Sequence, residues 1–192
     1  MSYIPQIGDI ILEDSDNTGA KIVKFFMTAP TVWHHLWRKI RSNQEKVKYY
    51  HVAMIINNGF NGFTGLGDEI EQQSKVQLAD WNPNHKQIIF RKIELIKEDM
   101  EDLKQEALSD LGQGYDILNC FGKFLTWLTG IKFFARYMEY PKAEICINRV
   151  AHWYKQVLNE RFGVVTHSEL TTHMIYKYLI NCGKYKIVYK KD

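Results

Sequence analysis

The 192-residue sequence predicts an α+β domain: an antiparallel sheet or partial barrel with helices packed on one side. Short runs rich in β-branched and aromatic residues, typical of strands, stand among longer stretches whose apolar residues recur at helical spacing. The apolar fraction of 45% is that of a globular protein, and the chain is long enough to bury a sizeable core. Since we find no internal repeat and no linker, we read residues 1–192 as a single domain.

Tyr49–Asn57, with the sequence YYHVAMIIN, gives the clearest strand signal. A glycine-rich connection over 58–68 leads to Glu69–Gln73, and such a turn predicts that the two strands are antiparallel neighbours. Alternation places three polar side chains on one face of the second strand: Glu69, Glu71 and Gln73. Further strands are predicted at Ile7–Leu12, Gln87–Ile93 and Tyr185–Tyr189.

Helical spacing and capping residues predict five helices, at Thr18–Met27, Lys97–Leu111, Tyr115–Leu128, 145–159 and Ser168–Ile180. Gly112 and Gly114 close the second of these helices. The aromatic residues of the third are typical of a core helix rather than of a cofactor site, and Ser168 is the expected cap of the last.

Composition and charge argue against several classes of protein. A net charge of +3 is too small to indicate a nucleic-acid partner, and three cysteines without a CxxC pair argue against a disulfide framework or a zinc ribbon. No signal peptide is recognisable, and the most apolar long window, Ile117–Ala135, is broken by lysines and glycines and makes a poor transmembrane span. We therefore expect a soluble, cytoplasmic or phage-borne protein. The basic segment 38–48 is read as solvated surface, with peripheral contact to a membrane or cell wall as the alternative.

Cys146 is the residue around which a site can be built. In Glu144–Tyr154, EICINRVAHWY, and the residues after it, Ile145, Val150, Trp153 and Val157 recur at helical spacing, and Asn148, Arg149, Lys155 and Gln156 fall between them. Cys146 therefore lies in the first turn of a helix, where free backbone N–H groups and the helix dipole favour the thiolate. Cys120 and Cys182 are read as small buried apolar residues.

A cysteine nucleophile needs a base, a group that orients the base, and donors for the oxyanion. His51 begins the strand 49–57, and Glu71 lies on the neighbouring strand 69–73. A histidine that begins a central strand, fixed by a polar residue of the next strand and facing a cysteine at the start of a helix, is the arrangement of papain-like folds. Glu69 and Gln73 are alternatives to Glu71 as the third member. The adjacent His34 and His35 lack an HxxxH spacing or a nearby acidic residue, so we read them as surface or packing residues rather than metal ligands.

The sequence resembles the permuted papain-like NlpC-type enzymes, in the YiiX/YebB-like branch, where the histidine precedes the cysteine in the chain. Seven short segments carry the resemblance in the family's order and span nearly the whole chain: IGDIIL (7–12), AKIVKFFMT (20–28), YYHVAMII (49–56), EIEQQSKV (69–76), GQGYDI (112–117), EICINRV (144–150) and SELTTHMIYKYL (168–179). The resemblance implies a circularly permuted papain-like fold.

Carried over by residue, the resemblance implies that Cys146 is the nucleophile, His51 the base, and Glu71 the group that orients His51. It also implies that Tyr115 borders the cysteine and assists the substrate or the oxyanion. Two positions depart from the family pattern: Ile147-Asn148 replaces Ser-Glu after the cysteine, and Thr171-Thr172 replaces Thr-Pro. Both departures bear on the polarity of the pocket and on the substrate.

The predicted function is that of a cysteine-dependent amidohydrolase or peptidase, which acts through a thioester on peptidoglycan-like peptides or small amides. The resemblance implies no metal and no organic cofactor, and it leaves the oligomeric state open. One alternative is a lipid acyltransferase or thioesterase-like enzyme that uses the same residues, with the aromatic stretch 121–137 facing lipid. The other is a non-catalytic binding or structural module that keeps the fold, for example in a phage particle.

Overall fold

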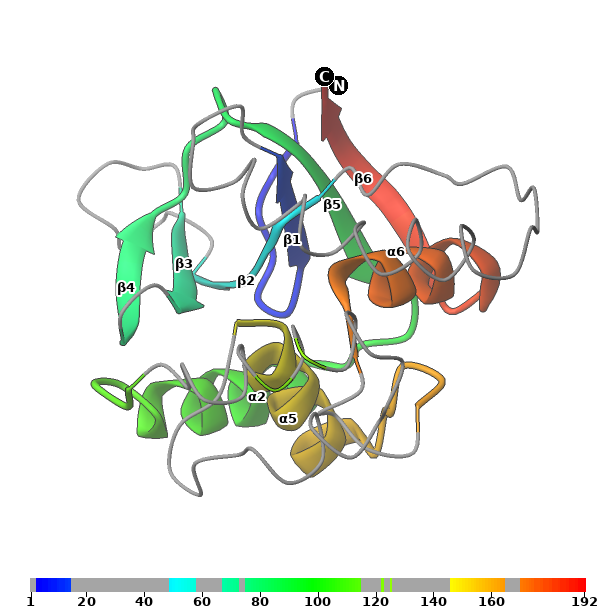
Figure 1. The fold of residues 1–192 in the computed structure, drawn as a ribbon. Coiled ribbons are helices and arrows are strands. Elements are labelled where there is room, and N and C mark those ends of the chain that lie inside the picture. The colour runs from blue at the N-terminus through cyan, green and yellow to red at the C-terminus, as the bar shows by residue number, and fades with distance from the viewer. Residues whose placement is uncertain are drawn as a thin grey trace.

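The computed structural model describes residues 3–14, 49–57, 67–72, 75–114, 122, 125, 146–164 and 170–192. These residues form six strands and three helices (Figure 1): β1 (Ile10–Asp14), β2 (His51–Asn57), β3 (Asp68–Gln72), β4 (Val76–Asp80), β5 (Lys86–Lys92), α2 (Lys97–Ser109), α5 (Cys146–Leu158), α6 (Thr172–Asn181) and β6 (Tyr185–Lys191).

The six strands form one sheet in the order β4-β3-β2-β1-β5-β6, and each pair of neighbours is antiparallel. The pairing of β2 with β3 confirms that the two strands flanking the glycine-rich connection are antiparallel neighbours. The predicted α+β class is therefore confirmed.

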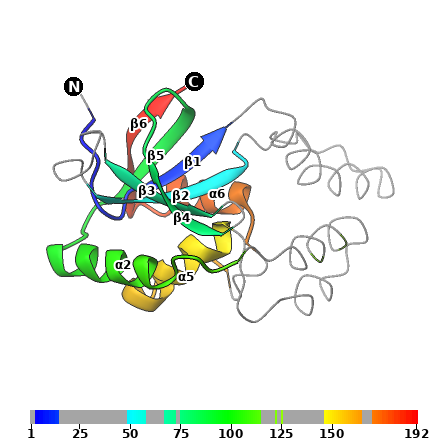
Figure 2. The same cartoon turned by 90° about the vertical axis from the view of Figure 1, so that its left-hand side faces the viewer.

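The described helices all pack against one face of the sheet (Figure 2). Alternate residues of the central strands, such as Leu12, Met54 and Phe90, belong to one buried cluster with residues of α2, α5 and α6. Trp153 and Tyr154 of α5 are among the largest fully buried side chains in that cluster. This face holds the main core, as the apolar periodicity of the sequence predicts.

The intervening residues of the same strands form a second cluster on the opposite face, with Ile11, Ile55 and Ile89 at its centre. Trp81, which follows β4, covers this cluster and contacts Tyr189 of β6 with ring centroids 5.7 Å apart. Since β4 and β6 are the two edges of the sheet, a residue beside one edge thus lies against the other edge. The sheet is curved in the manner of a partial barrel.

Two ends of β1 differ from the prediction. The strand begins at Ile10 rather than Ile7, because Gly8 has a φ of +83° and donates its N–H to the carbonyl of Ile55 in a turn. It continues to Asp14 rather than ending at Leu12, because Glu13 pairs with strands on both sides.

One strand was missed, and two predicted helix ends need correction. Strand β4 was not predicted at all. Helix α2 ends at Ser109 rather than at Leu111, and Leu111 is 43% exposed. Helix α6 begins at Thr172 rather than Ser168, since Thr171 accepts the capping hydrogen bond from the N–H of Met174.

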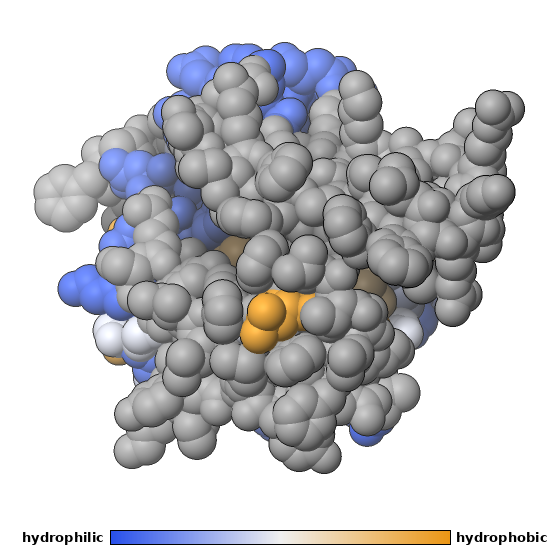
Figure 3. Space-filling model, viewed as in Figure 1, coloured by the Kyte–Doolittle hydropathy of each residue, from blue (hydrophilic) through white to orange (hydrophobic). Residues whose placement is uncertain are grey.

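Several predicted features lie outside the described residues, among them the helices Thr18–Met27 and Tyr115–Leu128, the basic segment 38–48 and the body of the glycine-rich connection. In the part of the chain that is described, no helix has both the length and the apolar character needed to span a bilayer. Most of the described surface visible in Figure 3 is hydrophilic, with only small apolar areas showing.

Candidate functional site

Cys146 is the first residue of α5, and its side chain is buried at the end of the helix that meets β2. Backbone N–H groups of Val52 and Ile147 hydrogen-bond its sulfur. One of these donors comes from the sheet and the other from the first turn of the helix. The helix N-terminus adds the positive end of its dipole, so three features of the backbone favour a negative charge on this sulfur.

His51 is the first residue of β2 and is also buried. Its Nε2 atom lies 3.3 Å from Oε2 of Glu71 on β3, a distance typical of an ion pair rather than of a short hydrogen bond. The other carboxylate oxygen of Glu71 accepts a hydrogen bond of 2.9 Å from the side-chain amide of Gln77 on β4. Glu71 is thereby held between the imidazole and the edge strand.

Cys146 and His51 shift each other's proton affinity. Burial alone would raise the pKa of the Cys146 thiol, but the charge of His51 and the hydrogen bonds to the sulfur outweigh it and lower the pKa. Burial would likewise lower the pKa of His51, but the charge of Cys146, the hydrogen bond with Cys146 and the nearby Glu71 carboxylate together hold it well above its usual value. Both shifts favour a thiolate beside an imidazolium.

Other buried carboxyl groups lie beside this pair. Ile70 points toward the helices, so its neighbours Glu69 and Glu71 point to the opposite face of the sheet, as Glu13 does on β1. Burial, followed by the charges of Glu13 and Glu71, raises the pKa of Glu69 to about 8. Within the described part of the chain, Oε2 of Glu69 has no hydrogen-bond partner. Glu69 is therefore largely protonated at neutral pH.

The structure brings together three of the residues that the sequence singled out, namely Cys146, His51 and Glu71. Glu69 shares a face with Glu71, but Glu71 makes the ion pair with the imidazole. Gln73, the other alternative to Glu71, lies outside the described residues. So does Tyr115, the fourth site residue implied by the resemblance. The catalytic roles stay predictions.

Sequence reasoning did not identify two polar residues near the site. Gln77 lies on the unpredicted strand β4, where only its register opposite Glu71 reveals it. Arg149 was placed between the apolar positions of α5, yet it is buried and pairs with Asp110 at 3.0 Å. A partner 39 residues away in the chain leaves no local signal.

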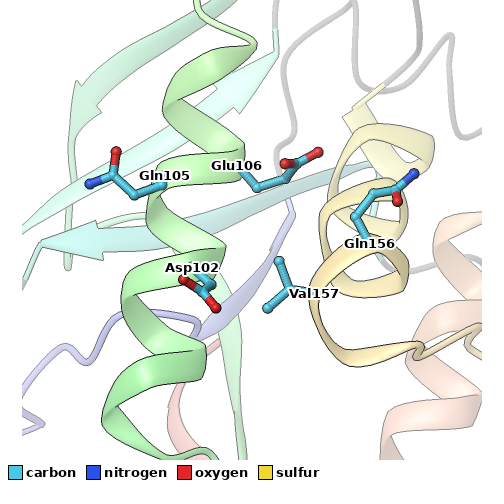
Figure 4. A pocket seen from close by; sticks show the side chains of 5 residues that line it. All are labelled: Asp102, Gln105, Glu106, Gln156 and Val157. Carbon is cyan, nitrogen blue, oxygen red and sulfur yellow. The ribbon is translucent and has the colours of Figure 1, made fainter.

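An open pocket of about 530 Å³ lies between α2 and α5 (Figure 4). Asp102, Gln105 and Glu106 line it from α2, and Gln156 and Val157 from α5. Gln156 is ten residues beyond Cys146, a rise of about 15 Å along a helix. The pocket is therefore distinct from the cluster around the cysteine.

No family model and no curated protein matches this sequence. Among solved structures, the chain is similar to the metalloprotein yiiX from Escherichia coli O157:H7 (DUF1105), with a TM-score of 0.59 and 16% sequence identity. The match covers 98% of this chain and 99% of that chain. In the described part of this chain, no group of three or more histidine, cysteine, aspartate or glutamate side chains is arranged to hold a metal ion. At this level of identity the likeness shows that the two proteins share a fold over nearly their full lengths.

Proposed function

We propose that the protein is a thiol-dependent amide hydrolase with a permuted papain-like fold. The observation that carries the proposal is a buried cysteine at a helix N-terminus, hydrogen-bonded to a buried histidine that in turn pairs with a glutamate of the adjacent strand. Covalent catalysis by cysteine requires a nucleophile, a base and a group that orients the base. Cys146, His51 and Glu71 would fill these three roles.

Each residue has a defined part in the proposed reaction. The Cys146 thiolate attacks the amide carbonyl, and the resulting oxyanion lies near the backbone N–H groups at the start of α5. The His51 imidazolium donates its proton to the departing amine, which leaves a thioester. His51 then removes a proton from water, and the hydroxide so formed adds to the thioester; collapse of the adduct releases a carboxylic acid and expels the Cys146 thiolate, which restores the thiolate–imidazolium pair. Glu71 orients the imidazole and stabilises its positive charge.

The order of the residues in the chain supports the permuted fold. His51 on β2 precedes Glu71 on β3, and both precede Cys146 on α5. Likeness to yiiX over nearly the whole chain is in keeping with the same topology. Although that protein is described as a metalloprotein, no step of the proposed reaction passes through a metal. By the sequence resemblance, the substrates are peptidoglycan-like peptides or other small amides.

The proposal is tested with a thiol-directed activity probe followed by a panel of peptide, γ-glutamyl amide and acyl-lipid substrates. We expect the probe to modify Cys146 and hydrolysis to occur with an amide substrate. If only the acyl-lipid substrates react, by hydrolysis or by transfer of the acyl chain, the acyltransferase alternative would replace the amidase assignment. A Cys146→Ala protein that performs the biological task as well as the parent would replace it by a binding module.

Cys182 provides a control within the same chain. It is a free, partly buried cysteine that caps the C-terminal end of α6. Labelling at about pH 6 should favour Cys146, because a thiol with a lowered pKa is more ionised there than an ordinary thiol. Equal, slow labelling of both cysteines would contradict the proposal. The variant Cys182→Ser should keep the activity of the parent.

A further inference from the structure

A buried polar cluster lies one turn along α5 from the cysteine. Asp110, the residue after α2, accepts hydrogen bonds from Nη1 of Arg149 at 3.0 Å and from Nε1 of Trp153 at 2.8 Å. Gln113 donates to the other carboxylate oxygen of Asp110 and accepts a second bond from Nη1 of Arg149. Arg149 and Trp153 are three and seven residues beyond Cys146, so they lie on the same side of the helix.

The same cluster is joined to the edge strand of the sheet. The N–H of Val76 on β4 donates to the carbonyl of Gln113, and the carbonyl of Val76 accepts from the N–H of Gly112. The next residue of β4, Gln77, donates its side-chain amide to Glu71. Two adjacent residues of β4 therefore serve both parts of the site. Gln77 holds Glu71. Val76 holds the turn 110–113, in which Asp110 binds Arg149 and Trp153 of α5.

The bonds that join α5 to the turn 110–113 and to β4 help to fix the distance between the sulfur of Cys146 and the imidazole of His51. Hydrogen bonds weaken steeply with misalignment, so a small rotation or translation of α5 would uncouple Cys146 from His51. The apolar side chains of α5 resist its separation from the sheet, but a packed apolar surface fixes register less strictly than directional, charge-assisted hydrogen bonds do. Asp110 makes two such bonds to residues of α5.

We propose that Asp110 is a positioning residue, which by its bonds to Arg149 and Trp153 fixes α5 so that Cys146 stays within hydrogen-bond reach of His51. This inference rests on the proposed function only where it predicts that loss of Asp110 lowers turnover. The position of Cys146 beside His51 sets the ionisation of the Cys146 thiol, and that ionisation can be measured without a substrate.

The test is the pH dependence of Cys146 alkylation by iodoacetamide, read by mass spectrometry of the Cys146 peptide in intact, folded protein. In Asp110→Asn the side-chain shape and one acceptor oxygen remain, but the charge that holds Arg149 is lost. We expect the alkylation midpoint to move to higher pH by about one unit, equivalent to roughly tenfold less thiolate at pH 6. An unchanged midpoint would overturn the role of Asp110.

Glu160 supplies a matched control near the other end of α5. It is a buried carboxylate that accepts hydrogen bonds from the hydroxyl of Tyr178 and from Nζ of Lys92, with Nζ of Lys184 3.6 Å away, so it resembles Asp110 in being held by an aromatic donor and by positive charge. Glu160→Gln should lower the melting temperature as Asp110→Asn does, but leave the alkylation midpoint of Cys146 where it is in the parent. If the alkylation midpoint of Cys146 shifts equally in both variants, Asp110 contributes to stability only and has no positioning role.

A second variant guards against failure of Asp110→Asn to fold. Gln113→Ala removes two bonds of the cluster without leaving a buried charge unpaired, and its backbone carbonyl still accepts from Val76. We expect a smaller shift in the same direction, and no shift would again contradict the proposal. If the parent itself shows an ordinary thiol midpoint, the proposed function fails; if only the variants fail to differ from the parent, the positioning role fails.

Discussion

Two groups of charged residues, each with buried carboxyl groups, lie at opposite ends of α5 and differ in the partners of those carboxyl groups. Around Glu160, two cations and a phenol surround one carboxylate, and the hydrogen bonds of Tyr178 and Lys92 outweigh burial and lower its pKa. Around His51, several carboxyl groups and a thiol share one imidazole, and Glu69 has its pKa raised to about 8. The first group has its charges neutralised in place, as expected of a structural ion pair, whereas in the second the pKa values of the thiol, the imidazole and Glu69 are all shifted, as expected of a functional site.

The largest contrast concerns turnover. We expect His51→Ala to reduce turnover of an amide substrate about 10³-fold or more, nearly as far as Cys146→Ala, because residues that act as a unit are not additive. Glu160→Gln should retain turnover close to that of the parent. Steady-state rates of the three variants measure this, and a His51→Ala protein with substantial activity would remove the histidine from the mechanism.

A smaller loss is expected for Glu71→Gln. The amide oxygen can still orient the imidazole, but it stabilises the imidazolium less than a carboxylate does, so turnover should fall about tenfold to a hundredfold. The alkaline limb of the rate profile should move to lower pH, because the pKa of His51 falls when its anionic partner is lost. A profile that keeps its shape would indicate that Glu71 has no part in setting the charge of the imidazole.

The stability of the Glu160 group should depend on pH in the sense usual for paired carboxylates. Its pKa is lowered on folding, so its contribution is present above its ordinary pKa of 4.5 and is lost as the pH falls through the folded value. Glu160→Gln should therefore reduce the free energy of unfolding by about 1–2 kcal/mol at pH 7 and by less at pH 3. Chemical denaturation at the two pH values would reveal an equal loss if the carboxylate charge were unimportant.

Glu69 should behave in the opposite sense. Its pKa is raised on folding from 4.5 to about 8, so the stability it contributes is complete below pH 4.5 and is lost as the pH rises through 8. Glu69→Gln, which cannot ionise, should melt near the parent temperature at pH 5 but about 2–4 °C higher at pH 8, equivalent to roughly 1 kcal/mol. A melting temperature lowered equally at both pH values would contradict the buried, protonated state.

How much could be predicted from the sequence differs between these regions. The β-branched run of β2 and the apolar periodicity of α5 mark elements whose patterns follow directly from burial on one face. Those two elements carry His51 and Cys146, so the main parts of the candidate site could be placed before the structure was known.

The parts that sequence reasoning missed depend on contacts between distant segments. β4 is a short edge strand whose residues alternate in exposure, with Leu78 half exposed, so its pattern resembles a polar loop. Arg149 lies in the buried first half of α5, where its charge is neutralised by Asp110 from a distant segment of the chain. Neither an edge strand nor a buried ion pair has a local signature in the sequence. For this reason the contact of Gln77 with Glu71 and the ion pair of Asp110 with Arg149 could not be predicted.

The central claim is that Cys146 is a thiolate beside a protonated His51, and the most direct test is the titration of thiolate ultraviolet absorbance in the parent, Cys146→Ala and His51→Ala. We expect the parent to show thiolate absorbance at pH 6 that is missing from Cys146→Ala. In His51→Ala the same absorbance should appear only near pH 8.5, the usual pKa of a cysteine. A parent protein in which Cys146 also ionises only near pH 8.5 would contradict the account.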